Sequence, residues 1–247
     1  MKQAHFRFYA QLNDFLPLAQ RSVTFPWEFE LSAAVKDMIE ALGVPHPEIA
    51  LILVNGWPAD FSYQVQDRDS ISVYPVWRSL DVSEVTAVLA NAPHRLHFAL
   101  DTHLGRLAAY LRMLGFDTVY WTEGGDEDLA RTCSAEDRIL LTRDRGLLKR
   151  TVIRTGYYVR ETDPRRQLQE IVQRFELTGV IQPFRRCLRC NALLRVVSKG
   201  SVRNRLREQT ARHFDEFWIC PQCDRIYWKG SHYEHMKRFL ERLLCAA

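Results

Sequence analysis

Arg95-Leu-His-Phe-Ala-Leu-Asp101 is the stretch that decides the fold of the middle part of this chain. It is a short apolar run that ends in an aspartate, which is typical of a buried strand that reaches the edge of a sheet. Residues 102–114 then repeat apolar side chains at helical spacing, and Gly115 suits the end of a helix. The stretch therefore predicts the first strand–helix unit of a larger domain.

The same alternation continues to residue 175 and predicts an α/β fold. Strands are expected at 95–100, 116–121, 138–142 and 157–160. Helices are expected at 102–114, 126–135, 146–154 and 164–175. Repeated units of this kind place parallel strands side by side with helices on both faces. Residues 94–180 are therefore predicted to form one domain, a parallel sheet flanked by helices.

Residues 1–81 show a different order: strands at 5–10 and 22–30, a helix at 32–42, and strands at 49–54 and 70–75. Ser32 is the expected N-cap of the helix, Gly43 its end, and Asn55-Gly56 a tight turn. This order fits a β-grasp domain and resembles ubiquitin-like and sulfur-carrier proteins. Those carriers act through a free C-terminal Gly-Gly, whereas this chain continues through Pro75-Val76-Trp77. Either an interaction with a protein partner or a packing role is therefore predicted in place of carrier chemistry.

Residues 181–247 contain two Cys-x-x-Cys pairs, Cys187 with Cys190 and Cys220 with Cys223. Each pair can place two thiolates on one tetrahedral zinc ion. Because sulfur fills all four positions, no position remains for a catalytic water, so the zinc is predicted to be structural. The long spacing between the pairs predicts an inserted helix at 204–217, and a closing helix is expected from Ser231. The segment is therefore predicted to be a four-cysteine zinc ribbon.

Charge is distributed unevenly along the chain. Residues 164–212 hold 12 Lys and Arg against 3 Asp and Glu, a net charge of +9, in a chain whose net charge is +4. This concentration favours a polyanionic partner, with nucleic acid ahead of membrane, and the alternative is a solvated basic face. Trp218, Tyr227 and Trp228 beside the cysteines could stack on bases, although shielding a small zinc core is the favoured interpretation.

Neither an apolar run long enough to span a bilayer nor a signal-peptide pattern at the N-terminus is evident. A cytoplasmic location without membrane attachment is the expectation. In that reducing compartment, the six cysteines are interpreted as metal ligands or free thiols before disulfides.

Aspartates follow two of the predicted strands: Asp101 ends the first, and Asp144 comes directly after Arg138–Arg143. In a parallel sheet, ligands gather at the carboxyl ends of strands. Asp126, at the start of a predicted helix, and Asp163, before Pro164, could join them. Clustered carboxylates need a cation between them, and hard oxygen ligands suit Mg²⁺ or Mn²⁺. The alternative for each is helix capping, which is the favoured interpretation for Asp163.

Two groups of motifs resemble the PIN-like RNase family named after the C-terminal domain of Mut-seven. The first group consists of Asp101-Thr-His-Leu-Gly105 and Leu141-Thr-Arg-Asp144. The second consists of the two cysteine pairs and Tyr227-Trp-x-Gly230-Ser-His232. The resemblance covers residues 94–240 and implies a PIN-type nuclease fold with Mg²⁺ or Mn²⁺ on acidic residues. It implies that Asp101 is the first acid, Asp144 the third, Asp126 the second with Glu127 as a rival, and Asp163 the fourth.

Four basic residues flank Asp144 and are candidates for contact with an RNA backbone: Arg143, Arg145, Lys149 and Arg150. The alternative is an exposed basic helix face. The leading hypothesis is a metal-dependent endoribonuclease that hydrolyses RNA phosphodiester bonds. The main rival is a non-catalytic RNA-binding protein with a structural zinc ribbon and a partner-recruiting β-grasp domain. A sulfur-transfer accessory protein is a weaker third possibility.

Overall fold

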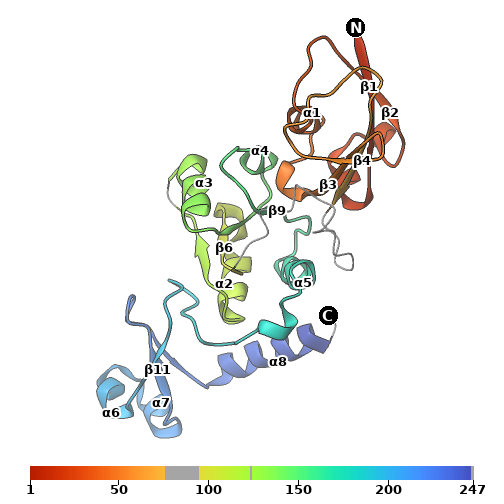
Figure 1. Ribbon diagram of the computed structural model, residues 1–247. Helices are drawn as coiled ribbons and strands as arrows, with labels where there is room; N and C mark the ends of the chain where they lie inside the picture. Colours follow the sequence, from red (N-terminus) through yellow and green to blue (C-terminus); the bar gives the residue numbers. More distant parts are fainter. Residues whose placement is uncertain (76–94, 123, 246–247) are drawn as a thin grey trace. The chain divides into compact units, whose positions relative to one another are not determined.

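The computed structural model describes residues 1–75, 95–122 and 124–245 (Figure 1). They form two compact units, one within residues 1–99 and 123–158 and the other within 100–122 and 159–247. The domain boundaries predicted at 81 and 94 lie outside the described residues. Within the described ranges, no helix has the length and hydropathy needed to cross a bilayer.

The N-terminal sheet has the order β2-β1-β5-β3-β4. Its strands are β1 (Lys2–Phe8), β2 (Phe25–Phe29), β3 (Ile49–Val54), β4 (Trp57–Ala59) and β5 (Ser70–Pro75). The central strands β1 and β5 run parallel, whereas β2 and β3 lie antiparallel to them. Helix α1 (Val35–Ala41) buries Val35, Met38 and Ile39 in the core of this domain. The predicted β-grasp fold is confirmed.

Two local predictions in this domain were wrong. Strand β2 begins at Phe25 and not at residue 22. Helix α1 begins after Ala34, and Ser32 does not cap it but accepts a hydrogen bond from Lys2 Nζ at 3.2 Å. The start of α1 is fixed by a tertiary contact, since the Val35 N–H donates to Tyr63 O at 2.7 Å. The Asn55-Gly56 turn is confirmed, because both residues have a positive φ, +52° and +86°.

The second sheet has the order β7-β6-β8-β9 and is the predicted parallel α/β sheet. Its strands are β6 (Phe98–Leu100), β7 (Thr118–Tyr120), β8 (Ile139–Thr142) and β9 (Gly156–Tyr158). Its helices are α2 (Gly105–Met113), α3 (Asp126–Ala135), α4 (Arg145–Leu148) and α5 (Pro164–Arg174). The helix predicted at 146–154 is only the short α4. The β-branched run Thr151-Val152-Ile153 does not favour a longer helix.

The third sheet, β10-β11-β12, lies in the C-terminal segment that carries the four cysteines. Its strands are β10 (Arg195–Val197), β11 (Phe217–Ile219) and β12 (Ile226–Trp228). The helix predicted at 204–217 is wrong: the insertion contains α6 (Lys199–Val202) and α7 (Glu208–His213), and Phe217 starts β11. Pairing with β10 and β12 on both sides draws residues 217–219 into the sheet.

Helix α8 (Ser231–Cys245) follows the ribbon and returns to the α2–α5 helix pair (Figure 1). The rings of Phe239 and Tyr110 lie 5.2 Å apart, and the Arg165 guanidinium lies 5.4 Å from the Phe239 ring. Helices α2 and α5 pack against each other through buried apolar side chains such as Leu111 and Ile171. Helix α8 therefore ties the C-terminal segment to the core of the second unit.

A buried arginine ties the Cys187–Cys190 loop to the same core. Arg112 of α2 is only 6% exposed. Its Nε donates to Thr118 O at 2.9 Å, and its Nη1 donates to Leu188 O at 3.2 Å and to Arg189 O at 2.8 Å. The last two carbonyls lie inside the Cys187–Cys190 loop. Three carbonyl acceptors compensate the loss of water around the guanidinium.

Asn191 forms a second link beside this one. Its Oδ1 accepts from the Thr118 N–H at 3.0 Å, and its Nδ2 donates to Asp117 Oδ1 at 2.9 Å. Asp117 in turn pairs with Arg186, Nη2 to Oδ2 at 3.3 Å. The turn between α2 and β7 is therefore bonded to Arg186 and Asn191, the residues on either side of the Cys187–Cys190 loop.

The β-grasp domain contacts the strand–helix units that follow Asp126. The buried Glu48 accepts from the Tyr158 N–H at 2.6 Å, and His46 Nε2 lies 2.8 Å from Ile153 O. The other ring nitrogen of His46 lies 2.6 Å from Glu40 Oε1, which fixes the orientation of the ring. These contacts make the β-grasp domain and the β8–α4–β9 segment parts of one compact unit.

Replacing Arg112 with Met should lower the free energy of unfolding by about 3 kcal/mol, because three buried carbonyls lose their charged donor. Urea unfolding of the full chain measures this change. Arg106→Met is the matched control, since Arg106 lies on the exposed face of the same helix and should change stability by less than about 0.5 kcal/mol. Equal effects of the two substitutions would contradict the proposed role of Arg112.

Replacing Glu48 with Ala should cost about 1–3 kcal/mol, because the Tyr158 N–H loses its acceptor at a buried position. Amide hydrogen exchange should show faster exchange at Tyr158 and in the rest of β9. Glu30→Ala, at an exposed position of the same domain, serves as the control. Unchanged exchange at Tyr158 in the Glu48 variant would show that this hydrogen bond does not hold the two segments together.

Candidate active site and metal centre

The four cysteines form a compact cluster, as predicted. The Sγ atoms of Cys187, Cys190, Cys220 and Cys223 all lie within 4.8 Å of one another. Two of the separations are 3.5 Å, between Cys187 and Cys223, and 3.2 Å, between Cys190 and Cys220. Four sulfur atoms at about 2.3 Å from one zinc ion would be roughly 3.8 Å apart. The cluster therefore fits a tetrahedral metal ion such as zinc.

The surroundings of the cluster favour ionised sulfur at one position and oppose it at another. Burial raises the pKa of Cys187, but hydrogen bonds from the Tyr227 hydroxyl and from the backbone of Cys190 and Arg189 outweigh burial and lower it to about 6. Burial raises the pKa of Cys190 to about 12. Four thiolates at these distances repel one another, so a cation is required before all four can be ionised.

Tyr227 was not assigned to the metal centre from the sequence. Its Oη lies 3.1 Å from Cys187 Sγ and accepts from the Leu188 N–H at 3.2 Å. Because the backbone N–H occupies one lone pair of this oxygen, the hydroxyl proton is available to the sulfur. The position of Tyr227 in β12, directly across from Trp218 of β11, brings its ring to the cluster. Only strand pairing creates this contact, so no local motif indicated it.

Asp101 directly follows β6 and is buried, with 8% of its surface exposed. Its Oδ1 accepts from the His103 N–H at 3.0 Å, which caps a short 3₁₀ turn at Thr102–Leu104. Tyr120 covers this turn, since its Oη donates to Thr102 O at 2.8 Å. A Cβ at Gly105 would lie 2.8 Å from the Tyr120 ring, so a larger residue there would require this ring to move. The carboxylate is thus fixed in a closely packed turn.

The other three aspartates lie at helix starts and are exposed. Asp144 follows β8 and caps α4 by accepting from Gly146 N–H at 2.6 Å and Leu147 N–H at 3.1 Å. Asp163 caps α5 by accepting from the Arg165 and Arg166 N–H groups at 3.0 and 3.1 Å. Asp126 is the first residue of α3. The predicted capping role of Asp163 is confirmed, and Asp144 has the same role.

Among the described residues, the four cysteines are the only group of three or more His, Cys, Asp or Glu side chains at mutual metal-ligand spacing. The structure therefore brings the predicted cysteines together, whereas the predicted aspartates do not form such a group. The sheet order nevertheless places β6 and β8 next to each other, and each strand is followed by an aspartate, Asp101 or Asp144.

Arg145 and Lys149, which were predicted to contact RNA, are bonded within the chain. Arg145 Nη1 donates to Phe15 O at 3.2 Å, and its guanidinium lies 5.1 Å from the Phe15 ring. Lys149 Nζ donates to Glu40 O at 2.6 Å. Arg150 is exposed, and Arg143 is half-buried. The structure thus places Arg145 and Lys149 against the β-grasp domain.

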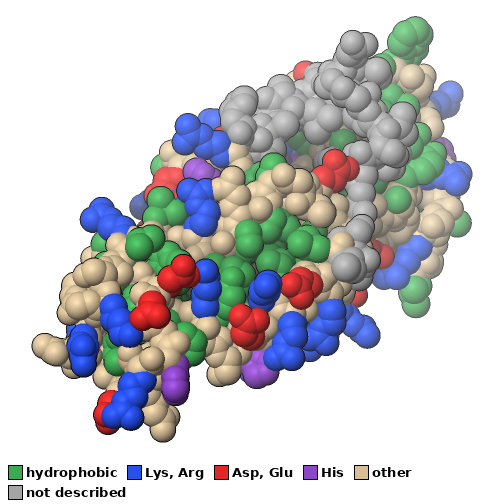
Figure 2. Space-filling view, turned by 90° about the horizontal axis from the view of Figure 1, so that it is seen from below, with side chains coloured by type: hydrophobic (Ala, Val, Ile, Leu, Met, Phe, Trp, Pro, Cys, Tyr) green, Lys and Arg blue, Asp and Glu red, His purple; other side chains and the backbone are tan. Residues whose placement is uncertain are grey.

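Lys and Arg side chains do not form one continuous patch on the face seen in Figure 2. They lie around an area of hydrophobic side chains, with Asp and Glu among them. Part of the basic excess is also paired: Lys199 with Asp215 at 2.9 Å, and Arg205 with Asp224 at 3.0 Å. Charge alone therefore does not mark out a binding surface for a polyanion.

Comparison with known families gives two matches. The model of the Mut7-C RNAse domain matches residues 96–240, and the model of the Mut7-C ubiquitin domain matches residues 1–81. The search of curated proteins and the search of solved structures each gave no match. The first match covers β6 to α8 and includes Asp101, Asp144 and the four cysteines. The chain therefore belongs to the Mut7-C RNAse domain family and carries the Mut7-C ubiquitin domain before it.

Proposed function

We propose that this protein is a metal-dependent endoribonuclease that hydrolyses RNA phosphodiester bonds. One observation carries the proposal: in a domain of an RNase family, an aspartate lies just after each of the neighbouring strands β6 and β8, one residue after β6 and two residues after β8. Carboxyl ends of neighbouring parallel strands are where α/β enzymes bind their ligands. Asp101 and Asp144 would hold Mg²⁺ or Mn²⁺ there, with Asp126 and Asp163 as further candidate ligands.

The carboxylate ligands suit a hard cation that keeps part of its water shell. When bound, the cation would supply a Lewis acid and an activated water for attack on phosphorus. The chain itself supplies rigid positions, because Asp101 is held by the His103 N–H and Asp144 by the N–H groups of Gly146 and Leu147. The capping bonds of Asp144 use only one of its two carboxylate oxygens, Oδ1. Asp144 could therefore cap a helix and bind a cation.

The cysteine cluster would hold zinc with a structural role in this proposal. Its sulfur atoms fit one tetrahedral ion, and all four positions would be filled by the protein. A reducing compartment such as the cytoplasm, which we propose as the location, would keep the thiols available for the metal. The β-grasp domain would bind a protein partner, as ubiquitin-like domains often do.

Asp144→Asn should abolish metal-dependent cleavage of single-stranded RNA, with a loss of more than about a hundred-fold, while leaving stability nearly unchanged. The reason is that asparagine caps a helix as well as aspartate does but is a much poorer ligand for a hard cation. The assay follows a labelled RNA in the presence and absence of Mn²⁺, beside urea unfolding of the same samples. Asp101→Asn should show the same loss of cleavage.

Asp37→Asn is the matched control, because Asp37 is an exposed aspartate in the first turn of α1. It should cleave as the unmodified protein does. Cleavage that persists in both Asp101→Asn and Asp144→Asn would refute the proposed metal site. RNA binding without any cleavage by the unmodified protein would instead support the rival function, a non-catalytic RNA-binding protein.

Removal of zinc should unfold the ribbon and leave the β-grasp domain folded. Cys220→Ser removes one ligand of a buried cluster and should lower the zinc content from one ion per chain to a small fraction, as measured by elemental analysis. Limited proteolysis should then cut first within residues 187–228. Cys133→Ser is the control, since Cys133 is buried in α3 away from the cluster and burial raises its pKa to about 12. Full zinc content in Cys220→Ser would contradict the assignment.

A further inference from the structure

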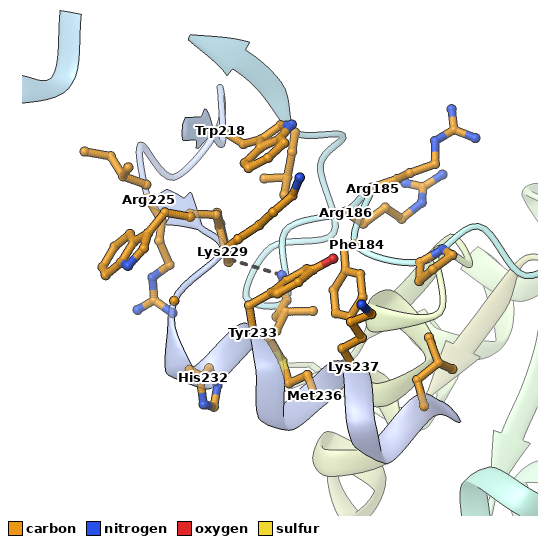
Figure 3. A pocket seen from close by; sticks show the side chains of 18 of the residues that line it. Phe184, Arg185, Arg186, Trp218, Arg225, Lys229, His232, Tyr233, Met236 and Lys237 are labelled. Atoms are coloured by element: carbon orange, nitrogen blue, oxygen red, sulfur yellow. Dashed lines mark hydrogen bonds between the residues drawn. The ribbon is translucent and has the colours of Figure 1, made fainter. Parts of the chain in front are cut away.

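A groove of about 1000 Å³ lies between the sheet β10-β11-β12, helix α8 and the segment at 183–188 (Figure 3). Its volume is at the upper end of the range for small-ligand sites, so it has room for a large ligand. Every residue that lines it belongs to the second unit. None of these residues is among those predicted to hold the catalytic cation.

The walls of the groove are aromatic and apolar. Figure 3 shows the rings of Phe184 and Tyr233 side by side, with centroids 4.6 Å apart, and Trp218 beside Lys229. Trp228 is 37% exposed and Val196 is 77% exposed, although both line the groove. These ring faces and aliphatic groups are in contact with water. An occupant that covers them would lower the free energy of the complex.

The border of the groove is basic. Three exposed cations line it, Arg185, Arg225 and Lys237, and they take part in no ion pair within the part of the chain that is described. Two further cations in the lining have partners: Lys229 pairs with Glu216 at 2.6 Å and Arg186 with Asp117 at 3.3 Å. Glu241 is the single acidic side chain among the lining residues described. The occupant is therefore expected to be anionic.

We propose that this groove binds single-stranded RNA, with bases against Trp228 and the Phe184–Tyr233 pair and phosphates near Arg185, Arg225 and Lys237. The inference rests on the proposed function in taking RNA as the ligand, but it concerns a site separate from the aspartates. Single strands expose base faces to aromatic side chains, whereas a duplex hides them inside its stack. An acidic peptide would satisfy the cations but offers no repeated planar groups for the rings.

The arrangement also distinguishes the roles of the three aromatic residues beside the cysteines. Tyr227 supports the zinc cluster through its hydroxyl, which fits the favoured shielding interpretation. Trp228 is partly exposed in the groove lining. Its neighbour Lys229 lies 5.4 Å from the centroid of the Trp218 ring, so that ring has a cation over one face already. Trp228 is therefore the better candidate for stacking on a base.

The test measures binding of a fluorescent single-stranded RNA by anisotropy, using the full-length zinc-loaded protein without added Mg²⁺ or Mn²⁺. Trp228→Ala should weaken binding about five- to a hundred-fold, because one base loses its stacking partner. Trp228→Phe should restore most of the affinity. An RNA of equal length with abasic positions should bind weakly and should not distinguish Trp228→Ala from the unmodified protein.

The triple variant Arg185→Ala/Arg225→Ala/Lys237→Ala tests the role of the cations at the border. It should bind more weakly and reduce the slope of log affinity against log salt by about 0.7 for each phosphate that is no longer neutralised. Trp57→Ala and Arg68→Ala are the controls, since both residues are highly exposed in the β-grasp domain. The zinc content of each groove variant shows whether its four-cysteine segment is still folded. If a Trp228 variant does not fold, the triple variant still tests the proposal.

The outcomes separate this inference from the proposed nuclease. If both the Trp228→Ala and the triple variant bind RNA with unchanged affinity, the proposal that the groove binds RNA is overturned, even if the unmodified protein cleaves RNA. Binding of duplex RNA as tight as that of the single strand would also overturn it. Reduced affinity in the groove variants, together with no cleavage by the unmodified protein when Mn²⁺ is added in a separate assay, would support RNA binding in the groove and refute the nuclease. An acidic peptide that competes fully, with no difference between RNA and abasic RNA, would assign the groove to a protein partner and overturn the RNA proposal.

Discussion

The buried guanidinium of Arg112 is the interaction on which the second unit depends. A charge in the interior is costly unless every donor finds an acceptor, and Arg112 finds three carbonyls in two different segments. Burial lowers its pKa, and the negative groups of Cys187, Cys190 and Asp117 oppose that effect. A divalent metal ion on four thiolates would carry net negative charge, which this cation would offset. One side chain thus joins the α2–β7 turn to the Cys187–Cys190 loop.

The β-grasp domain has a comparable relation to the segment around Asp144. Arg145 and Lys149 follow this aspartate, and both donate to backbone carbonyls of the β-grasp domain, Phe15 O and Glu40 O. These bonds hold the helix that Asp144 caps. The β-grasp domain is therefore hydrogen-bonded to residues that follow Asp144, a proposed metal ligand.

Helix capping and metal binding make similar demands on an aspartate. Each requires a carboxylate fixed at the end of a strand, where the backbone turns into a helix. Asp101 and Asp144 satisfy the first demand, and their N–H partners hold them in place. The difference lies in charge: a cap needs only an acceptor oxygen, whereas a hard cation needs the ionised carboxylate. Asparagine substitution separates the two functions because it keeps the acceptor and removes the charge.

The sequence by itself determined the α/β sheet, the β-grasp order and the cysteine cluster, because each leaves a local or periodic trace: apolar runs, helical spacing and Cys-x-x-Cys pairs. It did not determine the start of α1, the short α4 or the break-up of the helix expected at 204–217. Strand pairing and contacts such as Val35 N–H to Tyr63 O outweigh local preference there. Only the tertiary structure revealed the Arg112 link, the Tyr227 hydroxyl at Cys187 and the groove beside α8. These features join residues far apart in the sequence, and no local pattern records which backbone carbonyl or ring face will lie next to a side chain after folding.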